Sequence, residues 1–236
     1  MCDTCGCNTP DNHSHNEHDK RLLELHEDVM SSNEVYAQQN REYFNKQKIF
    51  TVNLLSSPGS GKTTLLEKTI RLLKNSVSVA VIEGDQQTEL DADRIRSAGA
   101  NALQINTGAG CHLDAHQISH AIKEIELDSN SLLMIENVGN LVCPSMFNLG
   151  EHFKVVILSV TEGDDKPLKY PHMFHAADIV VFNKTDLLPY VDFDIEKSQS
   201  YAKQINPKVI TFELSAKTGE GMTDWIDWLK LNLTNK

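Results

Sequence analysis

Seven short apolar runs alternate with amphipathic stretches from Ile49 onward. The runs are IFTVNLL, VSVAVIE, ALQI, SLLMIEN, FKVVILSV, DIVVFN and KVITFEL. Short buried strands separated by helices are typical of an α/β fold with a mainly parallel central sheet flanked by helices. Ligands of such folds bind beyond the carboxyl ends of the strands, so we expect functional residues in the loops that follow these runs.

The part of the chain before this pattern divides into two segments. Residues 1–19 are polar and hold too few apolar side chains to form a core, which predicts a flexible tail. Residues 20–48 contain no Pro or Gly and carry apolar side chains at loosely helical spacing, which predicts one or two helices packed on the main domain. Residues 49–236 then form one substantial domain, as the chain length allows.

Charge and hydropathy argue against several classes of partner. The chain has 33 acidic and 22 basic residues, a formal charge of -11, which would repel the phosphate backbone of a nucleic acid. No apolar run reaches the roughly 18 residues that span a membrane, and no signal-peptide pattern is present. We therefore expect a cytoplasmic protein. In that reducing compartment, its five cysteines indicate metal ligands or reactive thiols before disulfides.

The segment SSPGSGKTT at 56–64 has the order of a strand, a phosphate-binding loop and a helix. Glycines let backbone N–H groups approach a phosphate, and the helix N-terminus adds positive potential. Lys62 is expected to reach the β- and γ-phosphates and Thr63 to bind Mg²⁺, although Ser56 replaces the usual first glycine. The alternative is an ordinary turn before a helix. The candidate phosphate-binding residues are Gly59, Ser60, Gly61, Lys62, Thr63 and Thr64.

Two further motifs follow later runs and indicate a guanine site. Asn183-Lys184-Thr185-Asp186 resembles the Asn-Lys-x-Asp element of the GTPase superfamily, and the carboxylate of Asp186 can accept both adjacent donors of guanine. Ser215-Ala216-Lys217 resembles the last guanine-contacting loop of that superfamily, in which the backbone N–H of Ala216 would serve the base carbonyl. Each motif alone could be a turn. The three motifs in this order make a chance match improbable.

Acidic residues at two other strand ends complete the expected catalytic site. Asp85 follows VSVAVIE and Glu136 ends SLLMIE, so both are placed to hold Mg²⁺ directly or through water, and Gly139 could offer its N–H to the γ-phosphate. Either carboxylate could instead cap a helix. Asn140 stands where a water-positioning glutamine would be expected, which predicts slow intrinsic hydrolysis.

A first metal site is expected at the N-terminus. Cys2, Cys5 and Cys7 crowd around Gly6, and the free amino group could complete a four-coordinate site. A planar arrangement of thiolates and nitrogen would suit nickel and a tetrahedral one zinc. Chance clustering or redox-active thiols remain the alternative, against which stand the nearby histidines His13, His15 and His18.

A second set of candidate ligands lies inside the main domain. Cys111 and His112 follow a Gly-rich turn, and His112, His116 and His120 recur at helical spacing, so they share one face of a predicted helix. That face could equally be a solvated surface. Cys143 lies four residues after Gly139 in sequence, so a metal on it would respond to rearrangement of this segment on hydrolysis; a buried inert cysteine is the alternative.

These motifs together closely resemble those of the HypB hydrogenase nickel-incorporation GTPases, which are SIMIBI-class P-loop proteins. The matching segments are the Cys-x-x-Cys-Gly-Cys tail, SSPGSGKTT, EGDQQT, GAGCHLDA, ENVGNLVCP and NKTD, and they cover nearly the whole chain. The resemblance implies binding of GTP or GDP with Mg²⁺, a nickel site on Cys2, Cys5 and Cys7, and a second nickel or zinc site on Cys111, His112 and Cys143. It also implies a GTP-promoted homodimer, and as partners the zinc protein HypA and the hydrogenase large subunit.

Two other functions are compatible with the sequence. The urease-type accessory GTPase UreG shares the phosphate loop and NKTD, but Cys111, His112, Cys143 and the cysteine tail favour HypB. A nickel or zinc storage or sensing protein with a structural nucleotide is the second alternative. The histidine stretch is short for a storage role, and nickel release that is equal with GDP and GTP would favour sensing or storage.

Overall fold

The computed structural model describes residues 12–85, 90–108 and 110–234, with only the backbone described for residues 12–26 and 90. Its centre is a seven-stranded sheet in the order β3-β2-β4-β1-β5-β6-β7. Every strand pair is parallel, so the predicted α/β fold is confirmed. The strands are β1 (Phe50–Ser56), β2 (Val79–Asp85), β3 (Asn101–Asn106), β4 (Leu132–Glu136), β5 (Phe153–Ser159), β6 (Ile179–Asn183) and β7 (Ile210–Leu214).

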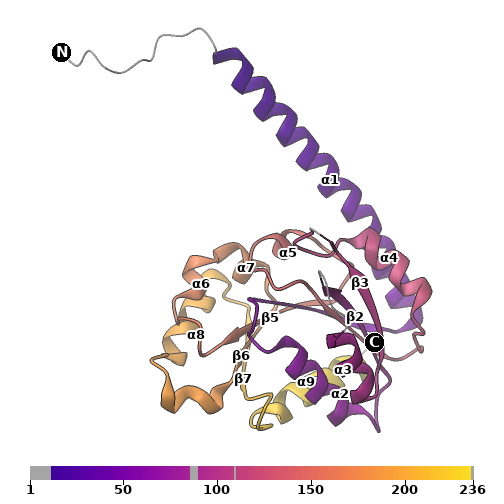
Figure 1. Ribbon diagram of the computed structural model, residues 1–236, viewed down its shortest axis with the longest axis vertical. Coiled ribbons are helices and arrows are strands. Elements are labelled where there is room, and N and C mark those ends of the chain that lie inside the picture. The colour runs from indigo at the N-terminus through magenta and orange to yellow at the C-terminus, as the bar shows by residue number, and fades with distance from the viewer. Residues whose placement is uncertain (1–11, 86–89, 109, 235–236) are drawn as a thin grey trace, which may run out of the picture.

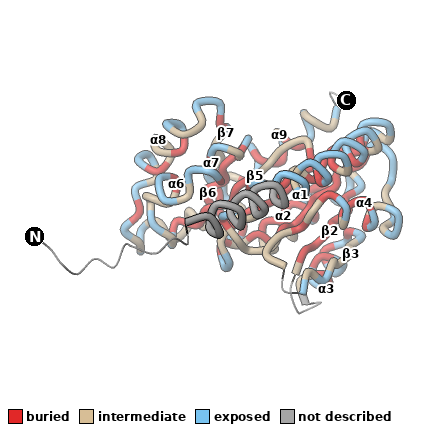
Figure 2. The backbone as a smooth tube through the Cα atoms, turned by 90° about the horizontal axis from the view of Figure 1, so that it is seen from above, coloured by how far each residue is buried: buried red, intermediate tan, exposed pale blue. Residues whose placement is uncertain are grey.

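The sheet forms where the seven apolar runs predicted it, because both of its faces are covered. Strands β1, β2 and β4 are buried almost along their full length, and Figure 2 shows buried segments in the interior with more exposed helices around them. Strands covered on both faces read as continuous apolar runs. The register pairs Leu54 with Glu136 and Glu136 with Glu83. The carboxyl ends of β1, β4 and β2 therefore lie side by side.

Helices cover the two faces of the sheet (Figure 1). One face packs on α2, α3 and α9 through side chains that include Leu66, Ile95 and Trp225. The other face has two separate clusters, one with α1 and α4 and one with α7 and α8. The helices are α1 (Asn12–Gln47), α2 (Lys62–Leu73), α3 (Leu90–Ala98), α4 (Ala115–Glu124), α5 (Cys143–Met146), α6 (Lys166–Lys169), α7 (Pro171–Ala176), α8 (Ile195–Ile205) and α9 (Met222–Thr234), with a 3₁₀ turn η1 (Thr185–Tyr190).

The N-terminal region is one long helix that extends beyond the body of the domain (Figure 1). Its buried residues Asn33, Ala37, Asn40 and Phe44 recur at helical spacing and face the domain. Helix α1 begins at Asn12, inside the stretch 1–19 that we predicted as a tail. The sequence favours this start, since no Pro or Gly follows Pro10 before residue 48. The flexibility of the tail stays a prediction, because residues 1–11 lie outside the described chain.

Within the described ranges, none of the helices has the length and apolar character needed to cross a membrane.

Candidate functional site

The loop between β1 and α2 has the backbone of a phosphate-binding loop. Gly59 and Gly61 have φ angles of 76° and 96°, in the left-handed region that favours glycine. A Cβ atom at Gly61 would also lie 2.6 Å from Nδ2 of Asn183. Glycine at position 61 is therefore required both by the turn into α2 and by the close approach of Asn183 at the carboxyl end of β6.

A cavity of about 610 Å³ opens in front of this loop. It is lined by the phosphate loop and by the carboxyl ends of neighbouring strands, as the sequence predicted. The expected residues that line it are Gly59, Ser60, Gly61, Lys62, Thr63, Thr64, Asp85, Glu136, Gly139 and Lys184. Glu83, Asp91 and Arg94 line it as well and were not predicted. The volume suits a ligand larger than a single phosphate.

Lys62 lies at the floor of the cavity. Its side chain is buried, and its Nζ atom donates a hydrogen bond of 2.8 Å to Oγ of Ser56. Burial lowers the pKa of Lys62, and the nearby carboxylate of Glu136 opposes that shift. Ser56, which replaces the usual glycine, thus holds the ammonium group in place.

Glu136 and Thr63, two of the residues expected to hold magnesium, lie in contact. Oγ1 of Thr63 donates a hydrogen bond of 2.9 Å to Oε1 of Glu136. Burial raises the pKa of Glu136 to about 7, and the ammonium of Lys62 opposes the rise. Among the described residues, Oε2 of Glu136 has no hydrogen-bond partner although it is buried. A hard divalent cation prefers such oxygen ligands, so the residues fit Mg²⁺.

Glu83 is an acidic residue of the cavity that the sequence reasoning missed. It is the direct neighbour of Glu136 in the sheet, and burial together with the charge of Glu136 raises its pKa to about 8. Its Oε2 atom also lacks a partner within the described chain. The signal was present, because two of the apolar runs end in glutamate, but only the register of β2 on β4 places these two side by side.

Asn183 joins three loops of the site. Its Nδ2 atom donates to the carbonyl of Ser60 at 2.9 Å, and its Oδ1 atom accepts from the backbone N–H groups of Lys184 and Ala216 at 2.8 and 3.1 Å. Lys184 donates from Nζ to the carbonyl of Gly59 at 2.7 Å. The Asn-Lys-x-Asp motif therefore braces the phosphate loop in addition to its expected contact with the base.

The candidate base-binding residues lie together beside the phosphate loop. Oγ of Ser215 donates to Oδ1 of Asp186 at 2.6 Å, which orients the carboxylate. The N–H of Ala216, expected to serve the base carbonyl, instead donates to Asn183 in this structure, because the buried side-chain oxygen needs the donor. Lys217 is exposed.

The candidate internal metal ligands converge on one point. Among the described residues, the one group of three His, Cys, Asp or Glu side chains close enough to share an ion is Cys111, His112 and Cys143, whose ligand atoms all lie within 4.8 Å of one another. Sγ of Cys111 lies 3.4 Å from Nδ1 of His112. Two thiols and an imidazole match the ligands that zinc and nickel take in proteins.

The surroundings of this cluster favour metal binding. Burial lowers the pKa of His112, which favours the neutral imidazole that a metal requires. The ring of His112 stacks on Phe147 with the two centroids 3.9 Å apart. A hydrogen bond with Cys143 raises the pKa of Cys111, so the two thiols are adjacent. Stacking and contact together hold the three ligands near a single position.

His112 precedes α4, so the prediction that it shares one helix face with His116 and His120 is wrong. These two histidines lie on α4, apart from the cluster. Both are exposed, and their Nε2 atoms are 3.1 Å apart. The ring of His116 contacts Tyr36 of α1 edge to face, with centroids 4.7 Å apart. Their role as ligands stays a prediction. The site predicted on Cys2, Cys5 and Cys7 lies outside the described residues, as do the side chains of the neighbouring histidines.

Comparison with known proteins identifies the family to which this chain belongs. The family model "CobW/HypB/UreG, nucleotide-binding domain" matches residues 50–213. The hydrogenase maturation factor HypB of Azotobacter chroococcum is 56% identical over 210 residues, which cover 89% of this chain and 69% of the relative.

Two solved structures are similar over most of the chain. The crystal structure of HypB from Archaeoglobus fulgidus has a TM-score of 0.79 and 43% identity, and the match covers 86% of this chain and 99% of that one. HypB from Helicobacter pylori, solved in complex with nickel, has a TM-score of 0.82 and 40% identity, with coverage of 86% and 96%. The chain therefore belongs to the CobW/HypB/UreG family and, within it, to the HypB hydrogenase maturation GTPases.

Proposed function

We propose that this protein hydrolyses GTP in the cavity at the carboxyl ends of β1, β2 and β4, and carries nickel as cargo on Cys111, His112 and Cys143. The main support for this proposal is that the ligand atoms of these three residues lie within 4.8 Å of one another. Cys143 also belongs to the segment that begins at Glu136 in the nucleotide cavity. A single stretch of chain thus serves both sites.

The nucleotide site distributes its tasks among the residues described above. Lys62 holds the β- and γ-phosphates, and the N–H groups of the loop and of the first turn of α2 bind the phosphate oxygens. Asp186, oriented by Ser215, accepts the two donors of guanine. Bound Mg²⁺ neutralises charge that develops on the phosphates. Thr63, Glu136 and Asp85 are the residues that would hold it, and Gly139 contacts the γ-phosphate.

The metal cluster suits cargo more than a permanent structural ion. Three protein ligands leave one position of a four-coordinate ion open, through which another molecule can take the metal. The thiols must lose their protons when an ion binds. The relative from Helicobacter pylori was solved in complex with nickel, which supports nickel as the cargo, and thiolates with imidazole also allow Zn²⁺.

The surface beside the cluster suits a protein partner. Val142 and Met146 flank Cys143 and its helix α5, and their exposed fractions are 53% and 43%. Exposed apolar residues gathered next to an ion are typical of a contact that forms during transfer. We propose a GTP-promoted homodimer at or near this surface, and as further partners a HypA-type zinc or nickel protein and the hydrogenase large subunit, in the cytoplasm.

The N-terminal thiols provide a second site in this proposal. Cys2, Cys5 and Cys7 would bind a separate nickel ion near the start of the long helix. The chain would then hold nickel at two sites that differ in their ligands. Replacing all three thiols with serine separates the two sites experimentally.

Nickel titration of the full chain tests the proposal. The charge-transfer band between thiolate and nickel is followed in protein loaded with GDP or with a non-hydrolysable GTP analogue and Mg²⁺. Cys111→Ala, His112→Ala and Cys143→Ala should each weaken the internal site, and the three serine replacements of the tail should remove one equivalent. Exposed His172→Ala, on α7 and outside the candidate ligands, is the matched comparison for His112→Ala. Unchanged nickel binding in the Cys143 and Cys111 variants would rule out the internal site.

A further inference from the structure

A buried amide, Asn137, lies between the nucleotide cavity and the metal cluster. It follows Glu136 directly, and only 1% of its surface is exposed. Its backbone N–H donates to the carbonyl of Leu54 at 3.1 Å, which continues the pairing of β4 with β1. Its main chain is therefore fixed to the central strand of the sheet.

The side-chain oxygen of Asn137 holds both functional loops. Oδ1 accepts a hydrogen bond from the N–H of Leu113 at 3.0 Å and another from the N–H of Val138 at 3.0 Å. Leu113 directly follows the ligand His112, and Val138 directly precedes Gly139. A single oxygen atom thus positions the loop that carries two metal ligands and the segment expected to contact the γ-phosphate.

Leu113 also packs on Gly84, a residue that lines the nucleotide cavity. A Cβ atom at Gly84 would lie 2.7 Å from Cγ of Leu113, so the leucine side chain packs directly on the backbone of Gly84. That glycine stands between Glu83 and Asp85, and all three line the cavity. Movement at the end of β2 must therefore displace Leu113, because a packed interior transmits displacement.

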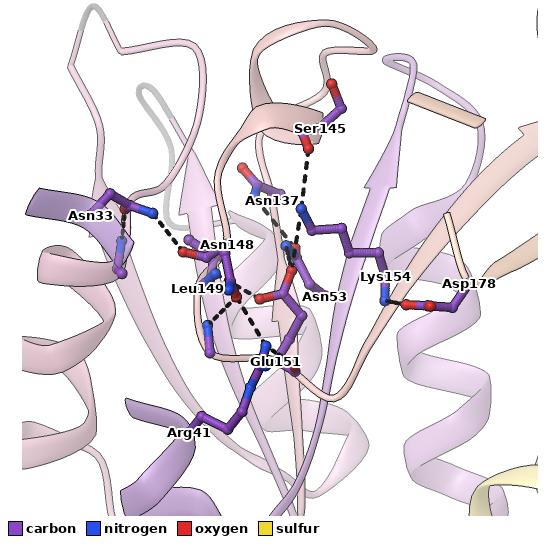
Figure 3. Close-up of polar contacts among 12 residues, drawn as sticks. Asn33, Arg41, Asn53, Asn137, Ser145, Asn148, Leu149, Glu151, Lys154 and Asp178 are labelled. Atoms are coloured by element: carbon purple, nitrogen blue, oxygen red, sulfur yellow. Dashed lines mark hydrogen bonds and ion pairs between the residues drawn. The ribbon is translucent and has the colours of Figure 1, made fainter. Parts of the chain in front are cut away.

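The third ligand is tied to the same amide by a chain of polar contacts (Figure 3). Nδ2 of Asn137 lies 3.4 Å from Oδ1 of Asn53, whose own amide donates to Glu151 at 3.2 Å. Nζ of Lys154 lies 3.8 Å from that carboxylate and donates at 3.1 Å to the carbonyl of Ser145. Ser145 belongs to α5, the helix that begins at the ligand Cys143. Both halves of the metal cluster are thus connected to Asn137.

We propose that Asn137 is a positioning residue that couples nucleotide state to metal affinity, an inference that rests on the proposed function. Gly139 lies against Pro58 of the phosphate loop, where a Cβ atom would come within 3.2 Å. When a γ-phosphate engages the N–H of Gly139, Val138 moves with it and its hydrogen bond to Asn137 changes. The remaining bond to Leu113 then shifts Cys111 and His112 relative to Cys143.

Coupling of this kind is measured as a ratio of affinities. All proteins tested are full chains that carry Cys2→Ser, Cys5→Ser and Cys7→Ser, so that the tail does not bind metal. The Ni²⁺ dissociation constant is measured against a chromophoric chelator with GDP and with a non-hydrolysable GTP analogue. We expect the two constants to differ by about 5–150-fold with Asn137 present. Asn137→Leu, which cannot accept a hydrogen bond, should bring the ratio within about 2-fold of one.

Two variants separate coupling from stability. Asn137→Asp keeps an acceptor for both N–H groups and should retain a nucleotide-dependent ratio. Asn40→Leu is the matched control, because Asn40 is equally buried and donates to two backbone carbonyls, of Ala115 and Leu149, at 2.8 and 3.0 Å. It should lower the midpoint of thermal unfolding without changing the ratio. A ratio that Asn137→Leu leaves unchanged would overturn the inference.

A measurement without a substitution at Asn137 covers the case in which Asn137→Leu does not fold. Replacing bound GDP with the GTP analogue should alter the rate of hydrogen exchange at the backbone amide of Leu113, which is far in sequence from the phosphate loop. Equal exchange in both states would also overturn the inference. Absence of Ni²⁺ binding before any substitution at Asn137 would instead refute the proposed metal function. Equal Ni²⁺ affinity in both states would refute the coupling and leave metal binding standing.

Discussion

Oγ1 of Thr63 donates a hydrogen bond of 2.9 Å to Oε1 of Glu136, which joins the first turn of α2 to the carboxyl end of β4. The two residues come from separate motifs, and their contact brings together oxygen atoms that fit Mg²⁺ beside the phosphate loop. The buried, unpartnered second oxygen of Glu136 within the described chain strengthens that assignment.

Replacing Glu136 with glutamine should impair catalysis more than folding. Glu136→Gln keeps the shape and can still accept from Thr63, but it removes the negative charge that would attract Mg²⁺. We expect GTP hydrolysis to slow by about 100-fold or more, with a higher Mg²⁺ concentration needed for half-maximal rate. Steady-state hydrolysis over a Mg²⁺ series measures this. Exposed Glu124→Gln is the control, and equal Mg²⁺ dependence of the two variants would contradict the assignment.

Glu83 should make the nucleotide-free protein less stable as the pH rises. Its folded pKa of about 8 exceeds the ordinary value of 4.5, so the folded state binds more protons than the unfolded state between these values. The free energy of unfolding therefore falls with pH across this window, by at most about 1.4 kcal/mol per pH unit from this group. Glu83→Gln should remove that component.

Urea unfolding of both proteins at pH values from about 5 to 9 measures the effect. The stability advantage of Glu83→Gln should grow as the pH rises towards 8 and then level off. Mg²⁺ with nucleotide should reduce it, because a cation stabilises the ionised carboxylate. A difference that does not vary with pH would show that the pKa of Glu83 is not raised.

Asp186 should determine the preference for guanine. Asp186→Asn loses one acceptor and gains a donor, so GTP affinity should fall by about 100-fold or more. The variant should bind xanthosine triphosphate, whose 2-oxo group accepts a hydrogen bond. Competition with a fluorescent guanine nucleotide measures both affinities. Exposed Asp192→Asn, close by in the chain, serves as the control, and equal affinity of the unmodified protein for ATP and GTP would refute the role of Asp186.

Two glycines of the phosphate loop should differ in their tolerance of alanine. Gly59 has a positive φ but free space around a Cβ atom, so Gly59→Ala should cost about 1–2 kcal/mol of stability. Gly61→Ala adds a clash with Asn183 and should cost more, while also weakening nucleotide binding. Urea unfolding and nucleotide titration compare the two. Equal losses of unfolding free energy in the two variants would show that Asn183 does not limit the space at position 61.

The sequence by itself determined the fold class and the positions of the nucleotide motifs. Buried parallel strands appear in the sequence as continuous apolar runs. The phosphate loop and NKTD can also be recognised locally, because their residues are adjacent in the chain. It also indicated Cys111, His112 and Cys143, through resemblance to HypB. Local sequence patterns predict the ends of helices less well than their presence. Helix α1 begins at Asn12, whereas the sequence pattern predicted a tail up to residue 19.

Only the tertiary structure decided how the motifs meet. The register of β2 on β4 places Glu83 beside Glu136, and burial together with the charge of Glu136 raises the pKa of Glu83. The packing of the carboxyl end of β6 against the phosphate loop lets the side chain of Asn183 brace that loop and accept the N–H of Ala216. The connection of Asn137 to Leu113 likewise joins residues far apart in the chain. Such contacts depend on strand order and burial, which no local spacing specifies.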